Sequence, residues 1–329
     1  MPASRKILVL YTGGTIGMQQ SSEGLMPASG FSERMHAQQA QQSSLQLPEW
    51  QFRELLPPID SANMTQHNWL AMVSAIREGV EQDGCDSVLV LHGTDTLAYS
   101  AAALSFLLLG LPAPVVLTGS MLPAGVPGSD AWDNLFGAMQ ALSAGVESGV
   151  HLYFSGKLML GVRASKLGTS SLDAFGVMPR ARTGQHMPVP SSLDYRQTRQ
   201  PVSLAVLPLY PGIAAGQLSA VLEGGVQGLV LECYGSGTGP SDDAQLLDAL
   251  SAAHQRGVVL AAISQCPQGH VDFDIYAAGS KLAATGLMSG GAMTREAALG
   301  KLFSLLGSGL SQTEVEHWFA LDLCGERAD

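Results

Sequence analysis

Three short segments contain hydroxyl, carboxylate and amine side chains beside glycines, a combination that suits acyl transfer. They are Thr12–Gly17 (TGGTIG), His92–Thr96 (HGTDT) and Arg163–Lys166 (RASK). A threonine hydroxyl is a weak nucleophile unless a neighbouring base takes its proton. A lysine can act as that base when desolvation lowers its pKa. Together the segments contain the groups for a nucleophile, a hydroxyl–carboxylate pair and a proton acceptor.

Each segment taken alone also fits a purely structural role. TGGTIG fits a tight turn with capping threonines, Thr94 or Asp95 fits a helix N-cap, and a lone lysine after a strand is usually solvated. TGGTIG is neither GxGxxG nor a Walker loop, so a nucleotide site is poorly supported. His92 fits a structural residue at a strand end, because no serine nucleophile motif accompanies it. Local spacing therefore leaves the choice open.

The elements that must position these segments form an α/β pattern. Short apolar runs alternate with helical patterns, as in a parallel sheet covered by helices on both faces. The candidate segments follow expected strands, and open parallel sheets bind ligands beyond the carboxyl ends of their strands. We expect strands at 6–11, 87–91, 113–117, 150–154, 158–162, 203–207, 228–231 and 258–263, and helices at 66–82, 97–109, 132–146, 214–223 and 241–256.

The sequence predicts two α/β domains, as its 329 residues suggest. Apolar periodicity stops at 180–199, where Pro, Gln, Ser and Arg are dense, which indicates a connection between domains. We expect a larger N-terminal catalytic domain with a mostly parallel, doubly wound sheet at 1–190. A linker at 191–202 and a smaller C-terminal α/β domain at 203–329 follow. The Gln- and Ala-rich segment 32–44 is expected to be mobile and helical in part.

Composition limits the partners and the compartment. The formal net charge of −11 and only 17 Lys and Arg residues argue against a nucleic-acid partner. The apolar run at 7–10 is shorter than the core of a signal peptide, and no stretch approaches the roughly 18–20 apolar residues of a membrane span. We expect a soluble, cytoplasmic protein with no membrane partner. Its cysteines form no CxxC pair and indicate reduced thiols rather than zinc or disulfides: Cys85, Cys233, Cys266 and Cys324.

Taken together, the motifs resemble the bacterial-type L-asparaginases, specifically their cytoplasmic type I branch. TGGTIG with HGTDT at this separation is a specific pair, and the resemblance extends from residue 6 to about residue 326. The matching residues are Tyr11–Met18, Asp60–Ser61, Leu91–Thr96, Leu117–Ser120, Arg163 with Lys166, Leu209–Gly212 and Tyr276–Gly279.

The resemblance implies catalytic roles for four residues. Thr15 would attack the side-chain amide carbon of L-asparagine, with Thr94, Lys166 and Asp95 as the activating group. Asp95 would orient the lysine and balance its charge. An acyl-enzyme ester at Thr15 would release ammonia first and aspartate after attack by water. Backbone N–H groups near Thr94 and the Gly119–Ser120 turn would hold the oxyanion.

The resemblance also implies how the substrate is bound. A carboxylate suits the substrate ammonium, and a hydroxyl with adjacent N–H groups suits its carboxylate. Pocket size alone separates asparagine from glutamine by only about 1–3 kcal/mol, so a minor glutaminase activity is compatible with the site. No metal or organic cofactor is implied, and a homodimer or homotetramer is expected. The expected substrate-binding residues are Asp60, Ser61, Ala62, Thr94, Asp95 and Ser120.

Two departures from the family pattern concern the active site. Leu25 occupies the position where many relatives have a tyrosine over the nucleophile, so Tyr276 of a neighbouring subunit becomes a candidate to replace it. Ala62-Asn63 stands where Ser-Asp is more usual, which puts one substrate contact in doubt.

A third departure concerns regulation. Some type I enzymes bind a second asparagine, and Ser165 and Cys266 match that site, but Glu232 stands where an arginine is found. A carboxylate there would face the carboxylate of the ligand. We therefore expect this regulation to be absent or altered.

Three other classes remain as alternatives. A binding module without turnover does not need the complete Thr15, Thr94, Asp95 and Lys166 set. A tRNA-dependent amidotransferase subunit would need a further N-terminal domain and a basic surface, whereas this chain starts at its first strand and is acidic. In an N-terminal-nucleophile hydrolase, Thr15 would have to become the chain terminus.

Overall fold

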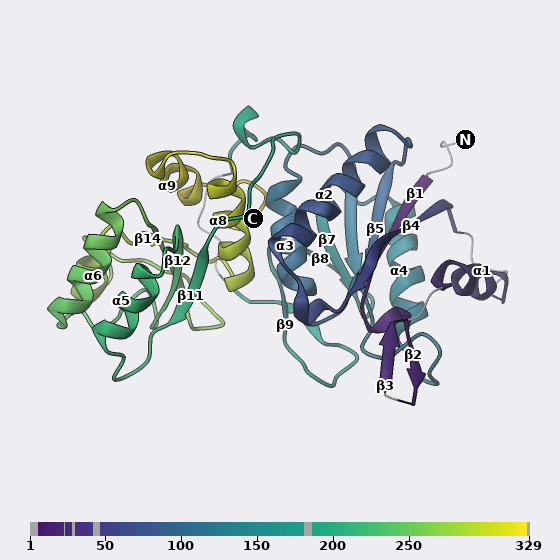
Figure 1. Ribbon diagram of the computed structural model, residues 1–329, viewed down its shortest axis with the longest axis horizontal. Coiled ribbons are helices and arrows are strands. Elements are labelled where there is room, and N and C mark those ends of the chain that lie inside the picture. Colours follow the sequence, from purple (N-terminus) through teal and green to yellow (C-terminus); the bar gives the residue numbers. More distant parts are fainter. Residues whose placement is uncertain (1–5, 23, 28–29, 42–46, 181–185, 328–329) are drawn as a thin grey trace. The chain divides into compact units, whose positions relative to one another are not determined.

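The computed structural model describes residues 6–22, 24–27, 30–41, 47–180 and 186–327 (Figure 1). They belong to two compact units, Met1–Gly176 and Val177–Asp329. This division falls earlier in the chain than the domain boundary at 190 expected from composition. The segment after Gly176 bonds within the second unit, because Arg180 donates to the carbonyl of Met293 at 2.5 Å.

The sheet of the first unit has the order β4-β1-β5-β6-β7-β8. The neighbouring strands β4, β1, β5, β6 and β7 run parallel to one another, and β8 runs antiparallel to β7. The chain runs from β1 outward to β4, then crosses to β5, so the winding direction switches between β1 and β5. Such a switch point is where open parallel sheets bind ligands. The strands are β1 Lys6–Gly13, β4 Glu49–Ile59, β5 Ser87–Leu91, β6 Pro114–Thr118, β7 Gly149–Phe154 and β8 Lys157–Leu160.

The strand register brings the ends of four strands to one level. Tyr11 pairs with Leu91, and Leu91 pairs with Thr118. Gly13 pairs with Ile59, the last residue of β4. The segments that follow β1, β4, β5 and β6 therefore leave the sheet at the same edge, which we call the carboxyl edge.

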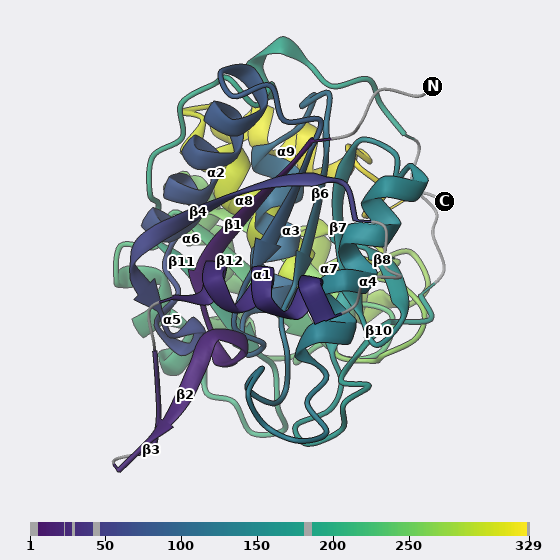
Figure 2. The same ribbon diagram turned by 90° about the vertical axis from the view of Figure 1, so that its right-hand side faces the viewer.

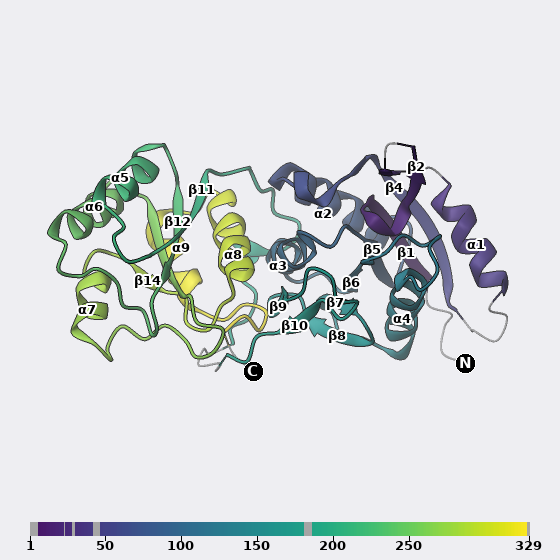
Figure 3. The ribbon, with the colours of Figure 1, turned by 90° about the horizontal axis from the view of Figure 1, so that it is seen from below.

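Helices cover both faces of this sheet, as the sequence predicts, and the α/β fold class is confirmed. Apolar side chains of α1 and α4 pack with Ile7, Val9 and Leu89 on one face. On the other face α2 contacts β1 and β5, and α3 contacts β6 and β7 (Figure 3). The helices are α1 Phe31–Gln41, α2 Gln66–Glu81, α3 Leu97–Leu107 and α4 Ala131–Ala144.

Three features of the first unit differ from the sequence-based expectation. Strand β4 was not expected, because its sequence EWQFRELLPPI contains charges and two prolines and it lies half-exposed at the sheet edge. The segment expected to be mobile and helical in part forms the regular helix α1 as far as Gln41, and this helix buries Phe31 and Met35; residues 42–46 lie outside the described part. Strands β2 Met18–Ser21 and β3 Gly24–Pro27 form a hairpin after the first motif, and Figure 2 shows it projecting from the sheet.

The second unit contains four parallel strands in the order β11-β12-β13-β14. Helices α5, α6 and α7 share a hydrophobic cluster with one face, and α8 and α9 contact the other. The short last strand was not expected, since two residues give too little pattern. Its elements are β11 Leu204–Pro208, α5 Ala215–Glu223, β12 Gly228–Cys233, α6 Ala244–Gln255, β13 Val259–Ser264, α7 Ala277–Ala283, β14 Met288–Ser289, α8 Arg295–Gly307 and α9 Gln312–Ala320.

Shorter elements complete the described chain. Strands β9 Ala164–Lys166 and β10 Phe175–Val177 form a two-stranded sheet. Single turns of 3-10 helix occur at Thr15–Gly17, Ser61–Asn63 and Ser191–Leu193. Within the described ranges, no helix has the length and apolar character needed to cross a membrane.

Candidate active site

Glycines let the backbones of three loops touch at the carboxyl edge. Gly14 has a φ of +87°, and a Cβ built on it would overlap the backbone of Gly93. A Cβ on Gly119 would overlap the carbonyl of His92. Because only glycine tolerates both the positive φ and the close approach, the TGGTIG sequence is needed for this contact. The loops that carry Thr15, Thr94 and Ser120 are therefore neighbours.

The structure separates the roles of the two threonines in the first motif. Thr12 is 1% exposed, and its hydroxyl donates to the carbonyl of Leu91 at 2.9 Å, which ties β1 to β5. Thr15 begins the 3-10 turn after β1 and is partly exposed. Thr12 is thus committed to the sheet, and Thr15 is the threonine of this motif that solvent and a ligand can reach.

Lys166 joins the second motif to the third. Its Nζ lies 3.1 Å from Oγ1 of Thr94 and 2.7 Å from Oδ1 of Asp95. The Lys166 side chain is 20% exposed, whereas that of Asp95 is 62% exposed. The lysine is positioned by β9, which packs against α3, the helix that follows the second motif. The carboxylate offsets a positive charge on the lysine, and the same nitrogen lies within proton-transfer distance of the Thr94 hydroxyl.

The Asp60–Ser61–Ala62 segment lies against the second motif. Ser61 is 4% exposed, and a Cβ on Gly93 would lie 2.5 Å from its hydroxyl oxygen. The Thr96 hydroxyl donates to the carbonyl of Ser61 at 2.8 Å, which holds the two loops together. Asp60 is exposed, and its carboxylate accepts the N–H of Ala62 at 3.2 Å. The segment thus presents the exposed carboxylate of Asp60 and the buried hydroxyl of Ser61, which lies beside Gly93.

Ser120 is fully buried, and its hydroxyl donates to the carbonyl of Leu122 within its own loop, at 2.6 Å. Asn134 supports this loop by donating to the carbonyl of Gly119 at 3.0 Å. Asp130 accepts the backbone N–H of Leu122 at 3.0 Å. The loop is therefore held by its own residues and by α4.

His92 has the environment expected of a structural residue. It is fully buried, and burial lowers its pKa to about 4, an effect partly opposed by a hydrogen bond with the Gly93 carbonyl. The imidazole is therefore neutral near pH 7. Among the residues that the structure describes, no group of three or more His, Cys, Asp or Glu side chains is placed to hold a metal ion.

Two further positions from the sequence analysis are Tyr276, the candidate from a neighbouring subunit, and Leu25, where many relatives have a tyrosine. Tyr276 precedes α7 in the second unit and is 59% exposed. Leu25 lies in β3 opposite Gln20, and its side chain is outside the described atoms. The sequence did not predict that Asn134 and Thr96 support the site. No motif contains Asn134, and Thr96 lies in HGTDT but the resemblance gave it no role.

Comparisons with known proteins agree with the geometry over most of the chain. The family model "Asparaginase, N-terminal" matches residues 6–198, and "Glutaminase/Asparaginase C-terminal domain" matches residues 203–319. L-asparaginase 1 of Escherichia coli K12 is 35% identical over 98% of each chain. The structure of a thermostable L-asparaginase from Thermococcus kodakarensis has a TM-score of 0.85 at 32% identity and covers 98% of this chain and 99% of its own. L-asparaginase I from Vibrio cholerae has the same TM-score and identity, with 99% and 100% covered.

Proposed function

This chain belongs to the asparaginase family, and on that premise we propose that it hydrolyses the side-chain amide of L-asparagine through an acyl-enzyme at Thr15. The observation that carries the proposal is the position of Lys166 Nζ between Thr94 Oγ1 and Asp95 Oδ1, on loops next to that of Thr15. A neutral amide reacts only with an activated nucleophile, and the Thr94–Lys166 pair can receive the proton of the Thr15 hydroxyl.

The proposed reaction has two halves. The hydroxyl oxygen of Thr15 bonds to the amide carbon, and its proton passes to the Thr94–Lys166 group. Backbone N–H groups near Thr94 and Gly119–Ser120 stabilise the oxyanion, and the C–N bond then breaks as the amide nitrogen takes up the proton and leaves as ammonia. Water attacks the ester, releases L-aspartate and restores the Thr15 hydroxyl. The Asp95 carboxylate, 2.7 Å from the Lys166 Nζ, orients the lysine and offsets the charge that it gains with the proton.

Recognition of the substrate is proposed to depend on its two charged groups. The carboxylates of Asp60 and Asp95 suit the ammonium, and Ser61 with the N–H of Ala62 suits the carboxylate. Ser120 contributes through its backbone, since its hydroxyl is used within its own loop. Glutamine is longer by one methylene, so we propose a minor glutaminase activity.

The setting of the enzyme is also part of the proposal. From the resemblance to type I enzymes we propose a cytoplasmic homodimer or homotetramer in which Tyr276 of one subunit faces the active site of another. The net charge of −11 favours a small-molecule substrate over nucleic acid.

Ammonia release from asparagine and glutamine tests the proposed reaction. Thr15→Ala should abolish turnover, and Lys166→Met should lower kcat by about 10²–10⁴-fold because it removes the general base. Lys157→Met is the control, since Lys157 pairs with Asp173 at the surface and both are about half exposed. Full activity of Thr15→Ala, or no ammonia from either substrate with the unmodified protein, would refute the proposal.

We further propose that regulation by a second asparagine is absent or altered. Glu232 is 5% exposed and already forms an ion pair with Arg295, at 2.5 Å and 2.9 Å. The Glu232 carboxylate would repel a ligand carboxylate at this position, and its own counter-charge, Arg295, is already used in the ion pair. Rate against asparagine concentration should be hyperbolic. Sigmoidal rates, with asparagine bound away from the active site, would contradict this part of the proposal.

A further inference from the structure

A buried chain of hydrogen bonds ends at the backbone of the second motif. Trp69 of α2 lies 2.8 Å from the Ser100 hydroxyl of α3, through its indole Nε1. The Ser100 oxygen lies 2.8 Å from Nε2 of His92, and Nδ1 of His92 lies 2.7 Å from the carbonyl oxygen of Gly93. The three side chains are at most 7% exposed. Two helices are thus connected to the peptide before Thr94.

Chemistry settles the direction of every bond in this chain. Indole N–H can only donate, so Ser100 accepts from Trp69. A carbonyl oxygen can only accept, so Nδ1 of His92 carries the proton that bonds to Gly93. In the neutral imidazole Nε2 is then bare and accepts the Ser100 proton. Burial lowers the pKa of His92 to about 4, so this neutral form is the one present near pH 7.

The last bond of the chain orients the peptide between Gly93 and Thr94. This peptide is trans, and in a trans peptide the C=O and N–H point in opposite directions. Holding the Gly93 carbonyl on the imidazole therefore directs the Thr94 N–H away from it. Gly93 also touches Gly14, so a turn of this peptide would disturb the loop that carries Thr15.

We propose that Trp69, Ser100 and His92 are positioning residues that hold the Gly93–Thr94 peptide so that the Thr94 N–H is set to bind the oxyanion. None of the three touches the substrate, and their effect passes through the backbone. The inference rests on the proposed amidohydrolase function and adds a support for its oxyanion site. A donor fixed before the reaction costs no reorganisation when charge develops, which is why its orientation affects kcat more than KM.

Paired serine variants of α3 test this role. Ser100→Ala removes the proton donor to His92, whereas Ser105→Ala removes another buried hydroxyl of α3, 6% exposed, which donates to the Ala101 carbonyl at 2.8 Å. For asparagine, Ser100→Ala should lower kcat at least about 5-fold, short of the 10²–10³-fold cost of losing an oxyanion donor, with KM within about 2-fold. Ser100→Thr, which keeps the hydroxyl, should restore most of kcat, and Ser105→Ala should stay within about 2-fold of the unmodified enzyme.

Nitrogen NMR of the His92 ring provides a measurement that does not need activity or a variant. The unmodified protein near pH 7 should show a protonated Nδ1 with slow proton exchange and a bare Nε2. A protonated Nε2, or equal kcat for Ser100→Ala and Ser105→Ala in an enzyme that does hydrolyse asparagine, would overturn the positioning role alone. Failure of the unmodified protein to hydrolyse asparagine would instead remove the proposed function on which it rests.

Discussion

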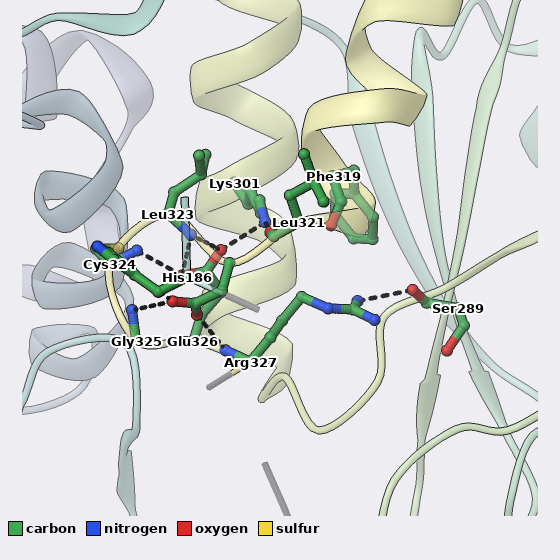
Figure 4. A network of polar contacts seen from close by, with 11 residues as sticks. His186, Ser289, Lys301, Phe319, Leu321, Leu323, Cys324, Gly325, Glu326 and Arg327 are labelled. Atoms are coloured by element: carbon green, nitrogen blue, oxygen red, sulfur yellow. Dashed lines mark hydrogen bonds and ion pairs between the residues drawn. The ribbon is translucent and has the colours of Figure 1, made fainter. Parts of the chain in front are cut away.

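Replacing Lys301 with methionine should destabilise the second unit strongly, because it would break an ion pair that is buried in the interior. Lys301 of α8 and Glu326 near the C-terminus are both 0% exposed (Figure 4). The Lys301 Nζ donates to Glu326 Oε1 at 2.5 Å and to the carbonyls of Phe319, at 3.1 Å, and Leu321. All three of its protons are therefore used.

The size of the effect follows from what remains after the change. Glu326 would keep the backbone N–H of Leu323, at 3.0 Å, and of Cys324, at 2.9 Å, but would lose the ammonium group that forms its buried ion pair. Breaking a buried pair by removing one partner costs about 3–5 kcal/mol. For a unit of the size of residues 177–329 this corresponds to a fall in Tm of roughly 6–20 °C.

Calorimetry and urea unfolding of matched variants measure this cost. Lys281→Met in the same unit is the control: Lys281 is half exposed and its partner Asp242 is 98% exposed, so about 0–1 kcal/mol is expected. Lys301→Met combined with Glu326→Gln should recover part of the loss, since the amide oxygen still accepts the backbone N–H groups without a buried charge. The reasoning is refuted if Lys301→Met unfolds at the same temperature as Lys281→Met.

Three further predictions concern the first unit. Gly14→Ala should lower kcat for asparagine more than 100-fold, since its Cβ would overlap the backbone of Gly93; ammonia release within about 10-fold of the unmodified enzyme would contradict this. Tyr11→Phe should leave the free energy of unfolding in urea unchanged or raise it by up to about 1 kcal/mol, because the buried Tyr11 hydroxyl has no hydrogen-bond partner in the described structure; a loss above about 1 kcal/mol would show a missed partner. The pKa of His92 is about 4 in the folded protein, below its usual 6.5, so the unfolded chain binds a proton that the folded chain does not as pH falls through this window. Folding stability should therefore decline from pH 6.5 to 4 by on the order of 3 kcal/mol more than in His92→Gln, and equal pH dependence of the two proteins in urea would argue against it.

The sequence by itself was sufficient for the fold class and for the choice of candidate groups. Strand and helix patterns are local, so most expected elements of both units lie within a few residues of the observed ones. The four candidate catalytic residues Thr15, Thr94, Asp95 and Lys166 lie in motifs that are visible in the chain, and the resemblance to the asparaginases, rather than local spacing, assigned their roles. Their expected convergence followed from the rule that parallel strands end at one edge.

Tertiary structure alone decided which groups are free to act and which support them. Thr12 and Thr15 are alike in the motif, and only the bond from Thr12 to Leu91 assigns Thr12 to the sheet. The half-exposed strand β4 has no apolar run, so only its pairing with β1 identifies it as a strand. Hydrogen bonds and ion pairs form between residues that packing brings together from distant positions, and no local pattern encodes that proximity. For this reason the bond from Ser100 to His92 and the pairing of Glu232 with Arg295 were not visible before the chain was folded.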